Sequence, residues 1–342
     1  MSTVSRRQFL GASCAAAALP AVSRVAWAQS FPARALRVVA GVAPGGAADI
    51  AARMVSELLA QRLGKPVALD TQPARLAAEF VAKAAPDGYT LLLANGLNAI
   101  NATLYHAANA DFVREIAPVA GLIRSPLVLV VNPGFATPTL ANFVTYARRS
   151  PGKISMASTG AGTAPHVAGE LFGLMARSKI ENANFRSDAD ALAGLMAGRV
   201  HLMFAPIEAA IGHVRAGRLR ALAVTSATRA AALPDAPAVA ESIPGYEASE
   251  WYVLGAPQRT PEAIVARLNS DVNAVLADAN VNARLGELHV LPLVMPSAEL
   301  RKYVSDEAEK WVRAEKFASA GLPEPGSSGY PAGSPGGYST GR

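Results

Sequence analysis

The sequence predicts an α/β fold of two lobes, in which each lobe is a mixed sheet flanked by helices. Apolar runs of strand length alternate along the chain with segments of helical periodicity, a pattern typical of α/β proteins. A strand that runs through a glycine turn into a helix occurs twice, after Leu36–Ala40 and after Ile154–Ala157. Two aliphatic strands, Leu127–Val131 and Trp251–Ala256, stand on either side of the second set. We expect them to pair as crossover strands between the lobes, which permits hinge closure around a ligand.

The first lobe opens with the buried strand Leu36–Ala40 and the helix Ala47–Leu63, which ends at Gly64. The residues expected on the inner face of this helix are Ile50, Met54, Val55, Leu58 and Leu59. The further elements expected in this lobe are strand Val67–Leu69, helix Leu76–Ala84, strand Thr90–Ala94 and the crossover strand Leu127–Val131.

A second set of elements begins where Asn132-Pro133-Gly134 breaks the pattern. It comprises helix Thr139–Arg149, strand Ile154–Ala157, helices Pro165–Ala176 and Ala189–Ala197, strand Val200–Phe204, helix Ile207–Ala216 and strand Ala221–Thr225. After Trp251–Ala256, two amphipathic helices, Pro261–Ala277 and Ser297–Ala320, complete the first lobe. The predicted division is therefore residues 29–131 with 251–321 in one lobe and residues 132–250 in the other.

The first 28 residues have the layout of a bacterial signal peptide. Arg6 and Arg7 precede a stretch of small apolar residues, and Ala26-Trp27-Ala28 supplies a cleavage site. The arginine pair indicates export to the periplasm by the twin-arginine route, and an ordinary secretory signal is the alternative. Cys14, the only cysteine, lies in this segment, so disulfides, zinc-thiolate sites and cysteine nucleophiles are excluded from the mature chain.

Charge and composition exclude further classes of function. The formal net charge is +6, but Lys and Arg are scattered and partly belong to the signal, which argues against a nucleic-acid partner. The histidines show no metal-ligand spacing, so we expect neither a metal nor a cofactor. Residues 322–342 are mainly Gly, Pro, Ser and Tyr, and we expect a disordered tail.

Each of the two glycine turns predicts a site for an anion. In the first, Pro44-Gly45-Gly46-Ala47 leads into a helix, so that backbone N–H groups and the helix dipole point at one spot. In the second, Thr159-Gly160-Ala161-Gly162-Thr163 precedes Pro165 and His166 in the same way. A tight turn that binds nothing is the alternative for each loop. Gly160 and Gly162 are not part of a dinucleotide fingerprint, because Pro165 stands where the third glycine is needed.

Several segments resemble the tripartite tricarboxylate transporter receptors, the Bordetella-uptake-gene (Bug) type of periplasmic binding protein. The segments are Pro44–Asp49, Ala85–Leu92, Pro126–Pro133, Gly217–Ser226 and Leu233–Glu241, and the resemblance runs in order from about Phe31 to about Gly321. It implies a two-lobed flytrap that binds small carboxylates through backbone amides, hydroxyls and waters. It also implies delivery of the ligand to the membrane subunits of a transporter.

The resemblance also implies which residues contact the ligand. Residues Pro44 to Ala47 would hold one carboxylate, and residues Thr159 to Thr163 with His166 would hold the other end of the ligand. Asn95 and Gly96 would line the cleft from the first lobe. The further expected positions are Phe185, Phe204 and Ala205.

This chain departs from the family pattern at some of these positions. Phe185 replaces a tyrosine, Asp188 adds an acid at a helix start, and Ala205 stands where an acid commonly follows Met-Phe. That missing acid is a plausible partner for a ligand ammonium. We therefore expect a cleft that is more apolar than usual and suited to an aliphatic or aromatic carboxylate rather than an amino acid.

The function expected from the sequence is that of a monomeric periplasmic receptor that captures a small organic carboxylate, with no chemistry on the ligand. One alternative is a protein of the same fold that presents its loaded form to a membrane sensor kinase. A carboxylate-ester hydrolase is the weakest alternative. It would use His166 beside Ser158, for which the sequence supplies neither a nucleophile elbow nor an orienting acid.

Overall fold

The computed structural model describes residues 31–42, 44–98 and 112–320. The predicted signal peptide and the predicted tail lie outside this range. The first half of the chain forms β1 (Leu36–Ala40), α3 (Ala47–Leu63), β2 (Val67–Thr71), α4 (Ala74–Ala82), β3 (Thr90–Asn95), α6 (Phe112–Glu115), β4 (Ile116–Val131), α7 (Leu140–Arg149), β5 (Ile154–Ser158) and α8 (Ala164–Ala176). The second half forms β6 (Ile180–Asn184), α9 (Asp188–Met196), β7 (Leu202–Pro206), α10 (Ile207–Arg215), β8 (Arg220–Val224), the short helix Val239–Glu241, β9 (Ser249–Pro257), α11 (Glu262–Leu276), α12 (Ala279–Glu287), β10 (Leu291–Pro292) and α13 (Ser297–Ala320).

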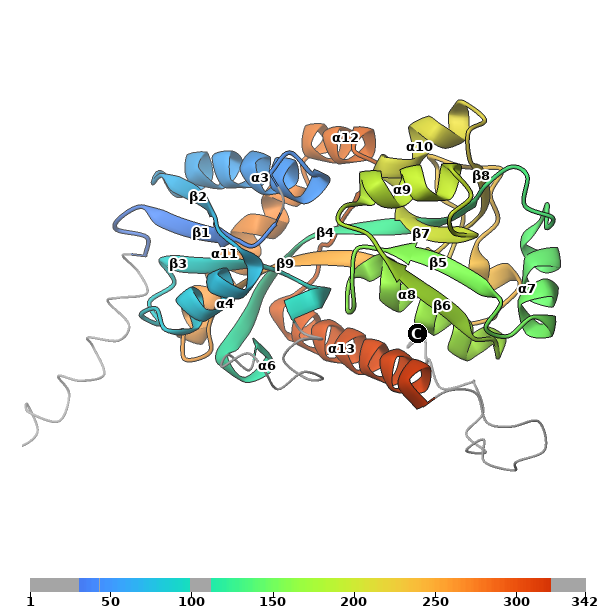
Figure 1. The fold of residues 1–342 in the computed structure, drawn as a ribbon. Helices are drawn as coiled ribbons and strands as arrows, with labels where there is room; N and C mark the ends of the chain where they lie inside the picture. The colour runs from blue at the N-terminus through green and yellow to red at the C-terminus, as the bar shows by residue number, and fades with distance from the viewer. Residues whose placement is uncertain (1–30, 43, 99–111, 321–342) are drawn as a thin grey trace, which may run out of the picture.

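The strands form two sheets that share the long strand β4, as predicted for an α/β fold with mixed sheets. The strand order is β2-β1-β3-β9-β4-β7-β5-β6, and β8 and β10 also pair with β4. In the first sheet β1 runs parallel to β2 and β3, whereas β9 is antiparallel to β3 and β4. In the second sheet β5 runs parallel to β6 and β7, whereas β4 is antiparallel to β7 and β8. Helices flank both sheets (Figure 1).

The crossover between the sheets differs from the expected pairing. Trp251–Ala256 does not pair with Leu127–Val131, but with the preceding part of β4. Arg124 lies opposite Trp251 and Pro126 lies opposite Ser249, and beyond Pro126 the strand β4 pairs with β7 and β8 instead. The chain thus passes from one sheet to the other within a single strand. Leu127–Val131 hydrogen-bonds in the second sheet, whereas the predicted lobe division had placed it in the first.

Helix α3 shows how the first core forms. Its buried face carries Ala48, Ala51, Ala52, Val55 and Leu59, and it packs on apolar side chains of β1 and β3 in one core cluster. Gly64 ends the helix in the left-handed conformation at φ 65°, as a C-terminal glycine is expected to do. The expected inner face was partly wrong, because Ile50 is 38% exposed. Alanines occupy much of the buried face, together with Val55 and Leu59.

Helix α13 contacts both halves of the molecule. Leu300, Val304 and Ala308 pack into a core cluster with β3 and β9, whereas Trp311 and Ala314 pack into the cluster around α8. Figure 1 shows α13 running beneath both sheets. The prediction had assigned it to the first lobe alone. In the described part of the chain, no helix has the length and apolar character needed to cross a membrane.

The close packing of β4 at Gly121 gives a stability prediction. A Cβ at this position would lie 2.1 Å from the backbone oxygen of Leu293, an atom that cannot move aside alone. We therefore expect Gly121→Ala to lower the free energy of unfolding by about 1–3 kcal/mol, as overpacking does in a filled core. Denaturant unfolding measures this change.

The matched control is Gly212→Ala in the exposed part of α10, where an added Cβ meets no atom within 4 Å. It should raise the free energy of unfolding by about 0.5–1 kcal/mol, because alanine is the better helix former. Equal effects of the two substitutions would contradict the packing described for β4.

Candidate functional site

The turn between β1 and α3 does not present all of its amides to a ligand. The N–H of Gly45 donates to Oδ2 of Asp49 at 3.0 Å. Asp49 is buried and forms an ion pair with Arg53 at 3.0 Å, and the hydrogen bond from Arg53 holds the pKa of Asp49 below its usual range despite burial. The expectation that Gly45 offers a bare N–H is therefore wrong. The first turn of α3 follows Gly46, which provides no side-chain cap, so the amides of Ala47 and Ala48 stand at the open end of the helix.

The turn between β5 and α8 is also partly closed by its own side chains. The N–H of Gly160 donates to Oγ of Ser158 at 3.2 Å, and that of Gly162 donates to Nδ1 of His166 at 3.3 Å. The Thr163 hydroxyl donates to the carbonyl of Gly160 at 2.7 Å, so it does not cap the helix. Helix α8 thus starts without a side-chain cap, and its first amide belongs to Ala164, because Pro165 has no N–H. Its first turn contains no acidic residue, unlike that of α3, which makes its positive end the stronger attractor for an anion.

Both helix starts open on one cleft. A hollow of about 100 Å³ is lined by Asn95, Gly96, Leu97, Thr159, Gly162, Thr163, Ala164, Pro165, Val167, Asp188, Pro206, Ser249, Glu250, Trp251 and Trp311. A second hollow of about 350 Å³ is lined by Gly41, Val42, Gly46, Ala47, Ala48, Asn95, Ile123, Ser125, Asp188, Pro206, Glu208, Ala209, Glu250 and Tyr252. Because Asn95, Asp188, Pro206 and Glu250 line both hollows, they mark the junction between them.

The structure brings about half of the predicted site residues to this cleft. Those that line it are Gly46, Ala47, Asn95, Gly96, Thr159, Gly162 and Thr163. Pro44, Gly45, Gly160 and Ala161 belong to the same two turns but are not among the lining residues. His166 is 7% exposed and lies beneath its loop, within 3.5 Å of Glu170, so it holds the loop from below.

Three predicted residues lie away from the cleft. Phe204 is fully buried in the core, with its ring 5.8 Å from that of Phe172. Ala205 is fully buried on the other face of β7, in a separate core cluster. Phe185 covers Gly194 of α9, where an added Cβ would lie 2.5 Å from the ring. Phe204 and Ala205 lie within β7, where alternate side chains enter the cores on its two faces, and Phe185 directly follows β6.

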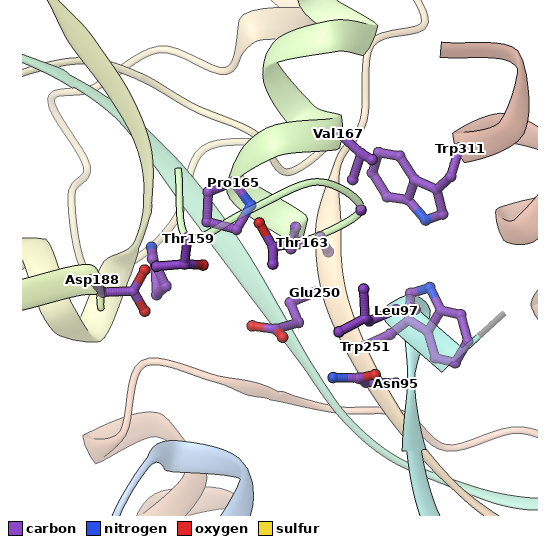
Figure 2. A pocket seen from close by; sticks show the side chains of 15 residues that line it. Asn95, Leu97, Thr159, Thr163, Pro165, Val167, Asp188, Glu250, Trp251 and Trp311 are labelled. Atoms are coloured by element: carbon purple, nitrogen blue, oxygen red, sulfur yellow. The ribbon is translucent and has the colours of Figure 1, made fainter. Parts of the chain in front are cut away.

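Three carboxyl groups that the sequence did not single out as site residues line the cleft. Asp188 begins α9, Glu208 lies in the first turn of α10, and Glu250 lies on β9. Figure 2 shows the carboxyls of Asp188 and Glu250 directed toward the same space from either side. No Lys, Arg or His is among the described residues that line either hollow. The cleft therefore carries acidic groups that the expectation of an apolar cleft did not include.

Burial and mutual repulsion favour the neutral forms of these acids. Burial, together with the nearby Glu208 and Asp188, raises the pKa of Glu250 to about 7, although a hydrogen bond from Tyr252 lowers it. Burial likewise raises the pKa of Glu208, although the Ser125 hydroxyl donates to its Oε2 at 3.2 Å. The pKa of Asp188 is also raised by burial. Among the described residues, no group of His, Cys, Asp and Glu side chains is arranged to hold a metal ion.

The raised pKa of Glu250 predicts how stability depends on pH. Because folding raises this pKa from 4.5 to about 7, the group's stabilising contribution is complete below pH 4.5 and disappears as the pH rises through about 7. Glu250→Gln should therefore increase the free energy of unfolding at pH about 8, by up to about 3 kcal/mol, and change it little near pH 4. Denaturant unfolding of the ligand-free protein at both pH values measures this. An equal effect at the two pH values, or the same effect from the exposed Glu299→Gln, would contradict the assignment.

Comparison with known proteins gives the family of this fold and cleft. The family model described as the tripartite tricarboxylate transporter family receptor matches residues 51–317. The chain is 29% identical to the protein BugT of Bordetella pertussis over 86% of its own length and 92% of that protein. Two solved structures from Rhodopseudomonas palustris are also similar. One is Rpa4515 with adipate (31% identity, TM-score 0.72, 84% of this chain and 98% of that chain). The other is MatC with bound malate (29% identity, TM-score 0.69, 83% of this chain and 99% of that chain). The protein therefore belongs to the Bug-type receptors of the tripartite tricarboxylate transporter family.

Proposed function

We propose that this receptor captures a small organic carboxylate in the cleft between its two sheets and delivers it to the membrane subunits of a transporter. The observation that carries the proposal is that α3 and α8 begin on the lining of one cleft, from opposite sheets. The receptor would act in the periplasm after export, and the paired Arg6 and Arg7 support the twin-arginine route.

The physical basis of carboxylate capture is the open end of each helix. The first N–H groups of a helix have no partner within it, and the helix dipole places partial positive charge there. Helices α3 and α8 have 17 and 13 residues, so both have a full dipole. With no basic side chain among the described lining residues, these amides and the hydroxyl of Thr159 are the groups that would neutralise a carboxylate.

The similar structures support this class of ligand. Adipate and malate, the ligands of the two similar solved structures, are both small dicarboxylates. The described residues give no comparable support to the hydrolase alternative, because the Ser158 side chain is fully buried and its oxygen accepts a hydrogen bond from Gly160. The family match favours a transporter over a sensor kinase as the membrane partner.

A proline substitution at the first position of α3 tests the role of its amides. Ala47→Pro removes one N–H at a helix position where proline is tolerated, and Gly46 before it is already extended at φ −74° and ψ 165°. If that N–H binds a carboxylate, affinity should fall about tenfold or more, since a hydrogen bond to a charged group contributes about 1.5–3 kcal/mol. Titration calorimetry with the carboxylate that most raises the melting temperature, from a panel including adipate and malate, measures the loss.

The matched control is Ala279→Pro at the first position of α12, where Asp278 already caps the next two amides and the residue is exposed. It should leave the affinity unchanged. If no small carboxylate in the panel stabilises the protein, the proposed function is wrong. If both prolines have the same effect, the α3 amides are not the site.

A further inference from the structure

The carboxyl groups in the cleft have no positively charged partner among the residues that the structure describes. Asp188 and Glu250 stand at the junction of the two hollows, and Glu208 faces the larger one. The described lining includes no basic side chain, and the side chains that donate hydrogen bonds to these acids, Ser125 to Glu208 and Tyr252 to Glu250, are neutral. In their ionised forms, three acids beside anion-binding amides weaken the binding of an anion unless the ligand also carries positive charge.

Within the described ranges of the chain, other buried polar atoms of the cleft-lining residues also have no hydrogen-bond partner. Trp251 is 0% exposed, yet its Nε1 has no hydrogen-bond acceptor, although the ring packs edge-on against Tyr303. Oδ1 of Asn95 and Oδ1 of Asp188 are likewise buried and have no donor. All three residues line the smaller hollow. A donor and two acceptors in one cavity suit a ligand that both accepts and donates hydrogen bonds.

The geometry points to a ligand with two poles, and this inference rests on the proposed function. We propose that the receptor selects an aminocarboxylate. Its carboxylate would lie at the start of α8 with the N–H of Trp251, and its ammonium would lie at the junction among Asp188, Glu250 and Asn95. Glu208 would add negative charge from the second hollow.

The arrangement of the lining residues explains why we place the carboxylate at the start of α8 and the ammonium at the junction of the two hollows. The smaller hollow contains Ala164 at the uncapped start of α8 together with the indole N–H of Trp251, all of them donors. The junction contains oxygen acceptors. Figure 2 shows Thr163 and Pro165 on one side of the cavity, with Glu250 and Asn95 across from them. A ligand that spans this hollow can therefore meet the start of α8 on one side and the oxygens of Glu250 and Asn95 on the other.

Ligands of equal length but different terminal charge test this inference. Titration calorimetry at neutral pH would compare glutarate, pentanoate, 5-aminopentanoate and L-norvaline, and the corresponding sets that are one carbon shorter and one carbon longer. In at least one set, an amine-bearing acid should bind at least about tenfold tighter than both the dicarboxylate and the alkyl acid, as expected for a hydrogen-bonded charge pair.

The outcomes of this comparison distinguish a failure of the inference from a failure of the proposed function. If dicarboxylates or alkyl acids bind as tightly as the amines in every set, the inference fails while the proposed function stands. Tight dicarboxylate binding that strengthens as the pH falls would mean that protons, rather than a ligand ammonium, neutralise the acids, and this also overturns the inference. If no acid in any set binds, the proposed function itself fails, and the inference fails with it.

Amide substitutions identify the residues responsible. Asp188→Asn and Glu250→Gln should each weaken binding of the best amine-bearing acid about tenfold or more and strengthen binding of the matching dicarboxylate, because they remove charge of one sign. Opposite changes for two ligands cannot arise from misfolding, and the melting temperature of each ligand-free variant checks this directly. Glu299→Gln, on the exposed first turn of α13, is the control and should change neither affinity. Parallel changes for both ligands would overturn the assignment.

Discussion

The antiparallel pairing of β4 with β9 is the constraint on which the rest of the structure depends. It continues to Pro126 opposite Ser249, where β4 leaves this partner for β7 and β8. At that point Glu250 and Trp251 come from one strand and Ser125 from the other, and all three line the cleft. One continuous strand therefore carries both sheets and fixes how the starts of α3 and α8 face the same space.

The cleft balances two electrostatic effects. Helix starts attract anions, whereas Asp188, Glu208 and Glu250 repel them, and burial shifts all three acids toward their neutral forms. The attraction of the α3 start for an anion is reduced by Asp49, which accepts a hydrogen bond from the Gly45 amide and pairs with Arg53. The start of α8 has no such internal anion. The two halves of the cleft are therefore unequal, and an unequal cleft suits a ligand with unlike ends.

Much of the fold was predictable, because the local signals agree with the tertiary structure. The bounds of β1 and α3 match the prediction, since an apolar run, a glycine turn and Gly64 mark them without conflict. The first part of β4 was missed because Pro118 and Gly121 resemble breakers, whereas in the sheet they accompany irregular register. Helix α12 was missed because its sequence is largely polar and its one sequence signal is the N-cap residue Asp278.

The site was only partly predictable, for a different reason. The two glycine turns are local motifs, so the sequence located them, but it could not show that Asp49, Ser158 and His166 would bond to their amides. Glu208 and Glu250 are distant in sequence and meet only through the sheet register and the start of α10. The apolar cleft was inferred from Phe185 and Ala205, and neither residue is among those that line the cleft.

The most direct test of carboxylate capture by the two helix starts is an NMR titration of the backbone amides with acetate. Acetate carries a carboxylate and nothing else that can hydrogen-bond, so it reports on the anion-binding groups alone. The account predicts that the amide protons of Ala164 and Ala47 shift downfield on binding, with the larger shift at Ala164. Acetate-dependent shifts confined to residues outside the cleft, with both of these amides unchanged, would contradict it.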